Sequence, residues 1–270
     1  MFIVTRLTVF SFIVAAGSLK AAELRVLDAK RYHLGTPGFF EWEEFADSKP
    51  HGRRLDVKFK AKSSKAAQTL LIRQRQVKFR WSVLLNNQRI GSLLSIDSKL
   101  VHKITVPPNK FRDGENTLSI VAPKATDDIE VGPIQLSSIS PERLFSNILN
   151  VEIKDADNGT PLPCRITIVD EKGVLAALRP APGQQLAHRP GVVYVSNGQA
   201  RIGLLPGSYT VFASRGFEYS VAKKAVEITL DKPAELQLEL RREVPTPGLI
   251  ATDTHIHTLT RSSHGDSTEK

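Results

Sequence analysis

Apolar and polar residues alternate one by one in several stretches of this chain. In residues 55–62, Leu, Val, Phe and Ala take turns with Asp and Lys, and residues 77–85 and 236–240 repeat the same period. Successive side chains of a β-strand point to opposite faces, so this alternation is typical of strands with one face in a core and one in water. The pattern predicts an all-β chain.

Turn residues separate these strands in the first half of the chain. Asn86-Asn87 suits a tight hairpin, and Asp113-Gly114 marks another turn. Several short strands at this spacing predict a β-sandwich over residues 23–148. The order of its strands and turns resembles the jelly-roll accessory modules that lie beside secreted hydrolases, many of which bind carbohydrate.

A second set of strands follows a boundary at residues 141–150 and predicts another β-sandwich over residues 149–242. Its turns, at residues 155–163 and 205–211, resemble those of carboxypeptidase-regulatory-like (transthyretin-like) β-sandwiches. In the second turn, Pro206-Gly207 supplies the fixed φ and the positive φ of a tight turn. The resemblance implies a structural support or docking domain without chemistry of its own.

A long insert rich in Pro and Gly, residues 179–191, interrupts the second sandwich. Long irregular loops in compact domains tend to be functional or flexible. We expect this insert to form, with residues 215–219, a lid or a docking surface for a following catalytic domain.

The first 22 residues have the pattern of a secretory signal peptide. Arg6 gives a positive start, residues 7–16 are apolar, and small residues follow. About ten apolar residues are too few to span the hydrocarbon core of a bilayer. The sequence therefore predicts export to the periplasm or the extracellular space, with no stable membrane insertion after signal cleavage.

Composition narrows the function classes. The chain of 270 residues has 41% hydrophobic residues, enough for sizeable cores, and its one cysteine excludes an internal disulfide framework. Cys164 lies in a strand-like run and is interpreted as a buried structural thiol. The net charge is +9, but Lys and Arg mostly alternate with apolar residues, which favours solvated strand faces over an anionic-ligand surface. Export and the lack of a nucleic-acid-binding motif argue against a nucleic-acid partner.

The C-terminal stretch carries the candidate chemistry. If residues 249–258 form a strand, Asp253, His255 and His257 point to the same face. Two imidazoles beside a carboxylate suit a divalent transition metal. The alternative is that H-x-H occurs by chance in a polar tail, since this spacing alone is a weak pattern.

The whole stretch Asp-Thr-His-Ile-His-Thr (253–258), followed by Ser-His-Gly-Asp (263–266), resembles the opening motif of PHP-domain metallohydrolases of the CehA/McbA type. The resemblance implies that His255 and His257 are metal ligands, and that His264 or Asp266 supplies a further one. In that family zinc, manganese or iron ions activate water for ester, amide or phosphoester hydrolysis. The remaining ligands come from later strands of an α/β barrel, so residues 243–270 correspond to a linker and a truncated first strand of that barrel.

Two functions remain open at this point. In the first, the chain is the N-terminal accessory region of an exported PHP-type hydrolase, inactive in this truncated form and of unknown substrate. In the second, it is a non-enzymatic secreted β-sandwich binding module for a small molecule or a carbohydrate. Candidate sugar-stacking residues are Phe39, Phe40 and Trp42, whereas Trp81 alternates in phase with core residues. Asp127-Asp128 is either a calcium ligand pair or an ordinary turn.

Overall fold

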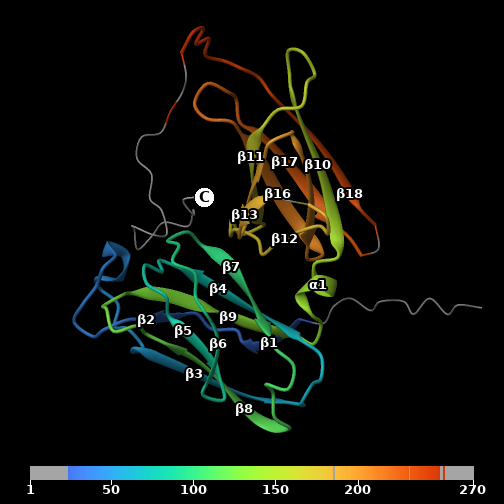
Figure 1. Ribbon diagram of the computed structural model, residues 1–270. Helices are drawn as coiled ribbons and strands as arrows, with labels where there is room; N and C mark the ends of the chain where they lie inside the picture. Colours follow the sequence, from blue (N-terminus) through green and yellow to red (C-terminus); the bar gives the residue numbers. More distant parts are fainter. Residues whose placement is uncertain (1–23, 185, 231, 250–251, 253–270) are drawn as a thin grey trace, which may run out of the picture.

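The computed structural model describes residues 24–184, 186–230, 232–249 and 252, and they form two β-sandwiches placed end to end (Figure 1). Apart from one short α-helix, α1 (Pro141–Leu144), and one 3-10 turn, η1 (Glu43–Phe45), the regular structure in this part of the chain is strand. The predicted all-β fold with two sandwiches is confirmed. No helix among the described residues is long and apolar enough to cross a membrane.

The first sandwich follows the winding of a jelly roll. Its strands are β1 (Leu24–Asp28), β2 (Tyr32–Leu34), β3 (Arg54–Ala61), β4 (Gln68–Arg75), β5 (Ser82–Leu85), β6 (Gln88–Ser92), β7 (Leu100–Val106), β8 (Gly114–Val121) and β9 (Ile129–Ser137). One sheet has the order β1-β9-β4-β7, with β2 also paired to β9, and the other has the order β3-β8-β5-β6. Apart from β1–β2 and the β5–β6 hairpin, each strand is followed by a strand of the opposite sheet, which is the jelly-roll arrangement.

Local sequence explains these elements in most places. In β3, Leu55, Val57 and Phe59 are buried while the residues between them face solvent. The β5–β6 hairpin turns at Asn86 and Asn87, whose φ values of 52° and 66° are those of a type I′ turn.

The predicted strand 77–85 is wrong over its first half, because β5 begins only at Ser82. Gln76, at a φ of 58°, follows the end of β4. The next residues run irregularly, and the N–H of Phe79 donates to the Asp127 carboxylate rather than to a neighbouring strand. Val77 and Trp81 are nevertheless fully buried, which explains their apolar character without a continuous strand.

The second sandwich contains the strands from β10 onward. They are β10 (Asn147–Asp155), β11 (Cys164–Asp170), β12 (Arg179–Pro180), β13 (Ala187–Arg189), β14 (Val192–Val195), β15 (Gln199–Leu204), β16 (Gly207–Ser214), β17 (Ala222–Ile228) and β18 (Ala234–Leu240). Its sheets have the orders β12-β15-β10-β18 and β13-β14-β11-β16-β17. The β10–β18 pair is parallel. Inward-facing side chains of both sheets form a core that is separate from that of the first sandwich.

The Pro- and Gly-rich insert is more regular than its composition suggests. It contains β12 and β13, which add short edge strands to the two sheets by pairing with β15 and β14. Residues 215–219 contact the chain after β18 instead, since Tyr219 pairs with Arg242 and the Glu243 N–H donates to the Glu218 carbonyl. The insert therefore closes one side of the second sandwich.

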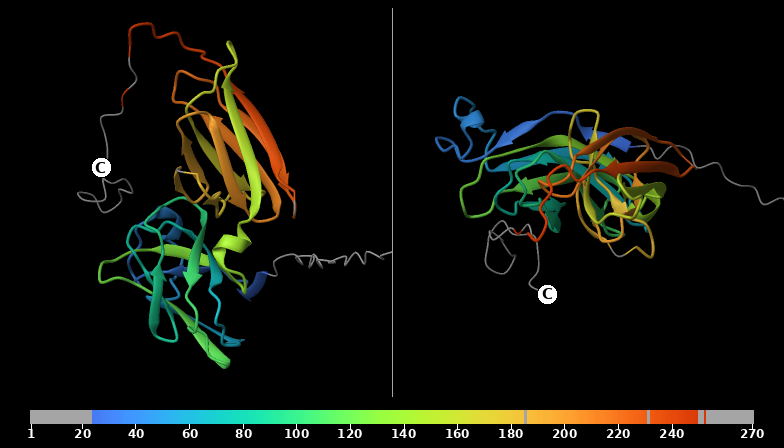
Figure 2. Two further views of the ribbon diagram at one scale, coloured as in Figure 1. Left: turned by 45° about the vertical axis from the view of Figure 1, so that its right-hand side comes forward. Right: turned by 90° about the horizontal axis from the view of Figure 1, so that it is seen from above.

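The two sandwiches meet at a joint built around α1, which lies between them in Figure 1 and in the left view of Figure 2. A small apolar cluster spans this joint and is formed by Leu71, Leu144, Phe145 and Ala177. The main chain also crosses it: the Leu175 N–H donates to the Lys99 carbonyl (3.0 Å), and the Val101 N–H donates to the Leu175 carbonyl (2.9 Å). Backbone pairing between sandwiches fixes their relative position more firmly than side-chain contact alone.

Side chains add to the same joint. Arg73 of β4 forms an ion pair with Asp170 at the end of β11. Lys103 of β7 donates to the Leu178 carbonyl (3.0 Å), and its ammonium lies 4.9 Å from the centre of the Phe145 ring. Burial lowers the pKa of Lys103.

Candidate functional site

The predicted metal ligands, His255, His257, His264 and Asp266, lie outside the described residues, and so does the predicted signal peptide. In the part of the chain that the structure describes, no group of three or more His, Cys, Asp or Glu side chains is arranged to hold a metal ion. The metal site therefore stays a prediction from sequence.

The candidate stacking aromatics lie on the long connection between β2 and β3. Phe39 and Phe40 are 38% and 53% exposed, and Trp42 is half-buried at the start of η1. Trp81 is fully buried, which confirms that it is a core residue. Phe39 and Phe40 thus lie side by side in sequence on the surface of this loop, as a stacking role would require.

Two adjacent buried aspartates each hold a different connection: Asp128 holds the β2–β3 loop, and Asp127 holds the segment before β5. Asp128 pairs with the His33 imidazole and accepts the Glu41 N–H at 3.3 Å. Asp127 accepts the N–H groups of Phe79 and of the Trp81 indole, both at 2.9 Å. Burial raises the pKa of Asp127, although these donors act in the opposite direction. Of the two interpretations of Asp127-Asp128, the structure supports a turn that binds protein N–H groups.

Ser48, His33 and Asp128 line up as hydroxyl, imidazole and carboxylate. The Ser48 hydroxyl lies 2.7 Å from His33 Nδ1, and Nε2 of the same ring faces Asp128. This order of groups occurs in serine hydrolases, which also need N–H donors aimed at the reacting oxygen. Here the Ser48 N–H donates to the Phe45 carbonyl at 3.0 Å. The array closes the turn after η1 and offers no oxyanion donor at Ser48.

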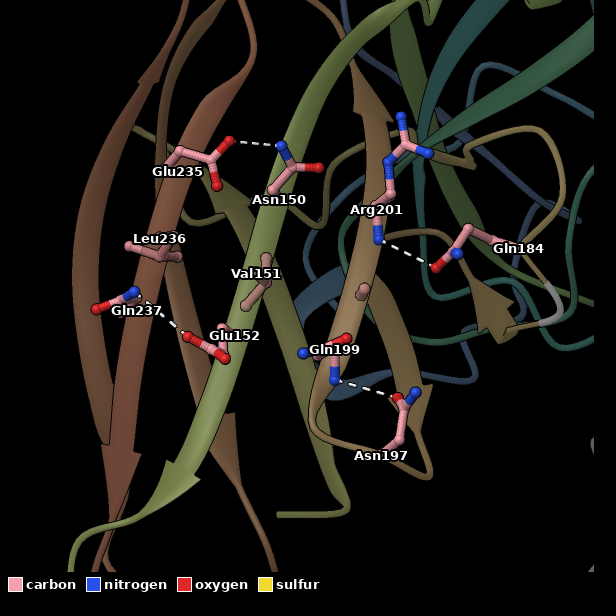
Figure 3. Close-up of a pocket in the computed structure, with 11 residues that line it drawn as sticks. Asn150, Val151, Glu152, Gln184, Asn197, Gln199, Arg201, Glu235, Leu236 and Gln237 are labelled. Atoms are coloured by element: carbon pink, nitrogen blue, oxygen red, sulfur yellow. Dashed lines mark hydrogen bonds between the residues drawn. The ribbon is translucent and has the colours of Figure 1, made fainter. Parts of the chain in front are cut away.

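A polar hollow of about 290 Å³ lies on the outer face of the second sandwich (Figure 3). We call it the amide groove, and its lining consists of Asn150, Val151, Glu152, Gln184, Asn197, Gln199, Ala200, Arg201, Glu235, Leu236 and Gln237. Strand alternation creates it, because the residues of β10, β15 and β18 that face outward are polar while their neighbours fill the core. Gln184 reaches it from the insert between β12 and β13.

Hydrogen bonds hold the side chains of the amide groove in place. Across the parallel pair β10–β18, the Asn150 amide donates to Glu235 (2.6 Å) and the Gln237 amide donates to Glu152 (3.3 Å). On the other side, Gln184 Oε1 accepts the main-chain N–H of Arg201 at 3.3 Å. The side-chain amide oxygen of Asn150, Oδ1, is shielded from solvent and has no hydrogen-bond partner among the described residues.

The chemistry of this groove is that of hydrogen bonding. Each Asn or Gln amide carries donors and an acceptor, the carboxylates accept, and Arg201 donates. A hydroxyl group also donates and accepts, so a ligand rich in hydroxyls matches this lining. No aromatic side chain lines the groove, so stacking plays no part in it.

Sequence reasoning missed the amide groove. Outward polar residues on β10 and β18 have the same pattern as any solvated strand face. Their grouping depends on the parallel pairing of strands that lie far apart in the chain. The sequence offers one signal for such a site, the amide side chains of Gln184, Asn197 and Gln199. Their spacing matches no known binding motif, so it does not predict a groove.

The comparisons with known proteins assign no family. No protein-family model matches the chain, and no curated protein matches it. Similar solved structures include BcpA, the major pilin subunit of Bacillus cereus, at 13% identity and a TM-score of 0.28; the match covers 70% of this chain and 64% of that one. Another is the shaft pilin SpaA from Lactobacillus rhamnosus GG, at 11% identity and a TM-score of 0.29, over 81% of this chain and 99% of that one. The chain spans less than two thirds of the BcpA structure, and scores this low identify neither a family nor a function.

Proposed function

We propose that this chain is a non-enzymatic β-sandwich binding module, and that its amide groove binds a hydroxyl-rich ligand of the carbohydrate class. The observation that carries this proposal is the grouping of amides and carboxylates on one hollowed sheet face. Such side chains pair with sugar hydroxyls as donor and acceptor at once.

Two features of the groove support binding over simple solvation. The Asn150–Glu235 and Gln237–Glu152 hydrogen bonds hold the side chains in place before a ligand arrives, which lowers the entropy cost of binding. The sandwich behind the groove, closed by the insert, supplies a rigid base.

The test is calorimetric titration of the purified chain with a panel of neutral oligosaccharides. For a ligand that binds, the double variant Asn150→Ala/Gln237→Ala removes two hydrogen-bonding side chains and should weaken binding about tenfold or more. A matched variant, Gln68→Ala/Gln88→Ala, removes two amides from the first sandwich and should bind like the wild type. A third variant, Phe39→Ala/Phe40→Ala, tests the aromatic loop. Saturable binding that is lost only in this third variant would move the site to the loop, and binding of no oligosaccharide would contradict the proposal.

A second candidate function rests on the C-terminal motif. The spacing Asp253, His255, His257 and its resemblance to PHP-domain metallohydrolases support an accessory region that precedes a metal-dependent hydrolase. The signal-peptide pattern of residues 1–22 supports export under either function. Metal content of the purified chain, compared with a His255→Ala/His257→Ala variant, tests this candidate. Stoichiometric zinc, manganese or iron that is lost in the variant would favour it, and equal content in both would count against it.

A further inference from the structure

A second groove runs along the joint between the sandwiches. Three neighbouring hollows meet there, and Arg73 lines all of them. The largest, of about 450 Å³, is lined by Ala29, Arg31, Arg73, Pro133, Gln135 and Lys172. We call the hollow lined by these six residues the joint groove. It combines residues from both sandwiches, so it exists only because the joint holds them together.

The backbone places Arg31 at this groove through a close contact. Gly132 has a φ of 102°, and a Cβ built on it would lie 2.1 Å from the Lys30 carbonyl oxygen. Only glycine allows this approach, which brings the β1–β2 connection against β9. Arg31 then stands at the rim of the groove with 71% of its side chain exposed.

The Asp170 carboxylate positions the other two basic residues of the groove, Arg73 and Lys172. Asp170 pairs through Oδ2 with Arg73, and its Oδ1 accepts the main-chain N–H groups of Lys172 (2.9 Å) and Val174 (3.0 Å). The turn after β11 is thereby fixed, and Lys172 projects beside Arg73 into the same hollow.

The balance of charge in the joint groove is positive. No carboxylate is among its lining residues, although Asp170 neutralises Arg73 from the adjoining hollow. Glu130 approaches Arg31 only to 3.7 Å and also pairs with Arg75 at 3.2 Å. On the outer strands of the first sandwich the basic residues face acids instead, as in Arg54–Asp56 and Lys58–Glu115.

We propose that the joint groove binds the carboxylate groups of an acidic polysaccharide. Guanidinium and ammonium donors pair with such oxyanions, and the amide of Gln135 adds a neutral donor. An adjoining hollow continues past Arg73 and contains two further cations, Arg75 and Lys99, beside Glu130, which leaves room for a polymer to extend from the groove. The lining contains no large apolar side chain for a lipid and no aromatic ring for a nucleobase. This site goes beyond the amide groove and involves different residues.

The test measures binding of oligogalacturonate to the purified chain at several salt concentrations. The double variant Arg31→Ala/Lys172→Ala should bind about fivefold or more weakly, with a reduced dependence on salt. Lys65→Ala/Lys224→Ala removes the same two charges from exposed positions elsewhere and should stay within about twofold of the wild type. Because all four side chains are exposed, thermal melts should show all variants folded.

Three results would overturn the proposal. Equal weakening in both double variants would show that net charge alone attracts the polymer. Inorganic phosphate that binds as tightly as the oligomer would reduce the groove to a single-oxyanion site. Vesicles containing phosphatidylserine that bind through Arg31 and Lys172, without oligogalacturonate binding, would make it a membrane contact. The amide-groove variant Asn150→Ala/Gln237→Ala should leave oligogalacturonate binding unchanged, so failure here is distinct from failure of the neutral-glycan proposal.

Discussion

The two sandwiches differ in how they use buried polar groups. Among the described residues, the fully buried polar side chains all belong to the first sandwich, and they are Thr69, Gln74, Asn116, Ser119, Asp127, Asp128 and Ser137. The core of the second sandwich consists of apolar residues and Cys164. The same alternation of strands therefore supports two different kinds of interior.

The reason lies in the connections. In the first sandwich, long connections fold back on the sheets, and side chains satisfy their main-chain groups. Gln74 accepts the Leu94 N–H (3.1 Å) and donates to the Leu94 carbonyl (2.7 Å), and Asn116 bonds the main chain of Arg112 in the same two-way manner. In the second sandwich, the side chains of Asp155 and Asn158 fix exposed turns instead. A core that holds loops through buried hydrogen-bonding groups loses more stability when one of those groups is removed, and a titratable one such as Asp127 also makes its stability depend on pH.

The largest effect that tests this comparison is expected for Asp127→Ala. The change leaves the N–H groups of Phe79, Trp81 and Asp128 without their acceptor, and we expect unfolding free energy to fall by about 2–4 kcal/mol. Ile166→Val, a small change in the second core, should cost about 0.5–1.5 kcal/mol. Urea denaturation of both variants provides the measurement. A loss for Asp127→Ala no greater than for Ile166→Val would mean that burying the carboxylate costs as much as its hydrogen bonds return.

A smaller effect should appear as acid sensitivity at His102. Burial lowers its pKa to about 4, and its Nε2–H donates to the Ser92 carbonyl at 3.1 Å. Below the ordinary pKa of 6.5, the unfolded chain takes up a proton that the folded chain does not, so stability falls as the pH drops from about 6.5 to 4. Since the ring is partly exposed, we expect a loss of about 1–3 kcal/mol.

The His102 effect is measured as the difference between the wild type and His102→Gln across this pH range. Asp127 works in the opposite direction, because its raised pKa favours the folded state on acidification. Taking the difference removes that contribution, which both proteins share. Parallel stability curves for the two proteins would show that His102 does not cause the acid sensitivity.

The sequence predicts those parts of the fold that depend on neighbouring residues, and it does not predict those that depend on distant ones. Alternation identified strands such as β3 and the Asn86–Asn87 hairpin, because these depend on neighbours in the chain. The segment 77–81 was misassigned because a distant carboxylate, Asp127, replaces the strand partner there. The amide groove and the joint groove were not predictable, since each forms where strands or turns far apart in sequence meet.

The smallest effect is expected at Cys164, and it separates the two interiors most directly. The residue is 8% exposed in the second core, and burial raises the pKa of its thiol to about 11. A thiolate is needed for reaction, so labelling with a thiol reagent at pH 8 should require opening of the second sandwich. Because the two cores are distinct clusters, Asp127→Ala should change the labelling rate by no more than about threefold. An acceleration of about tenfold for each 1.4 kcal/mol of lost unfolding free energy would instead show that both sandwiches open together. Leu71 and Phe145 would then couple them into one cooperative unit across the joint.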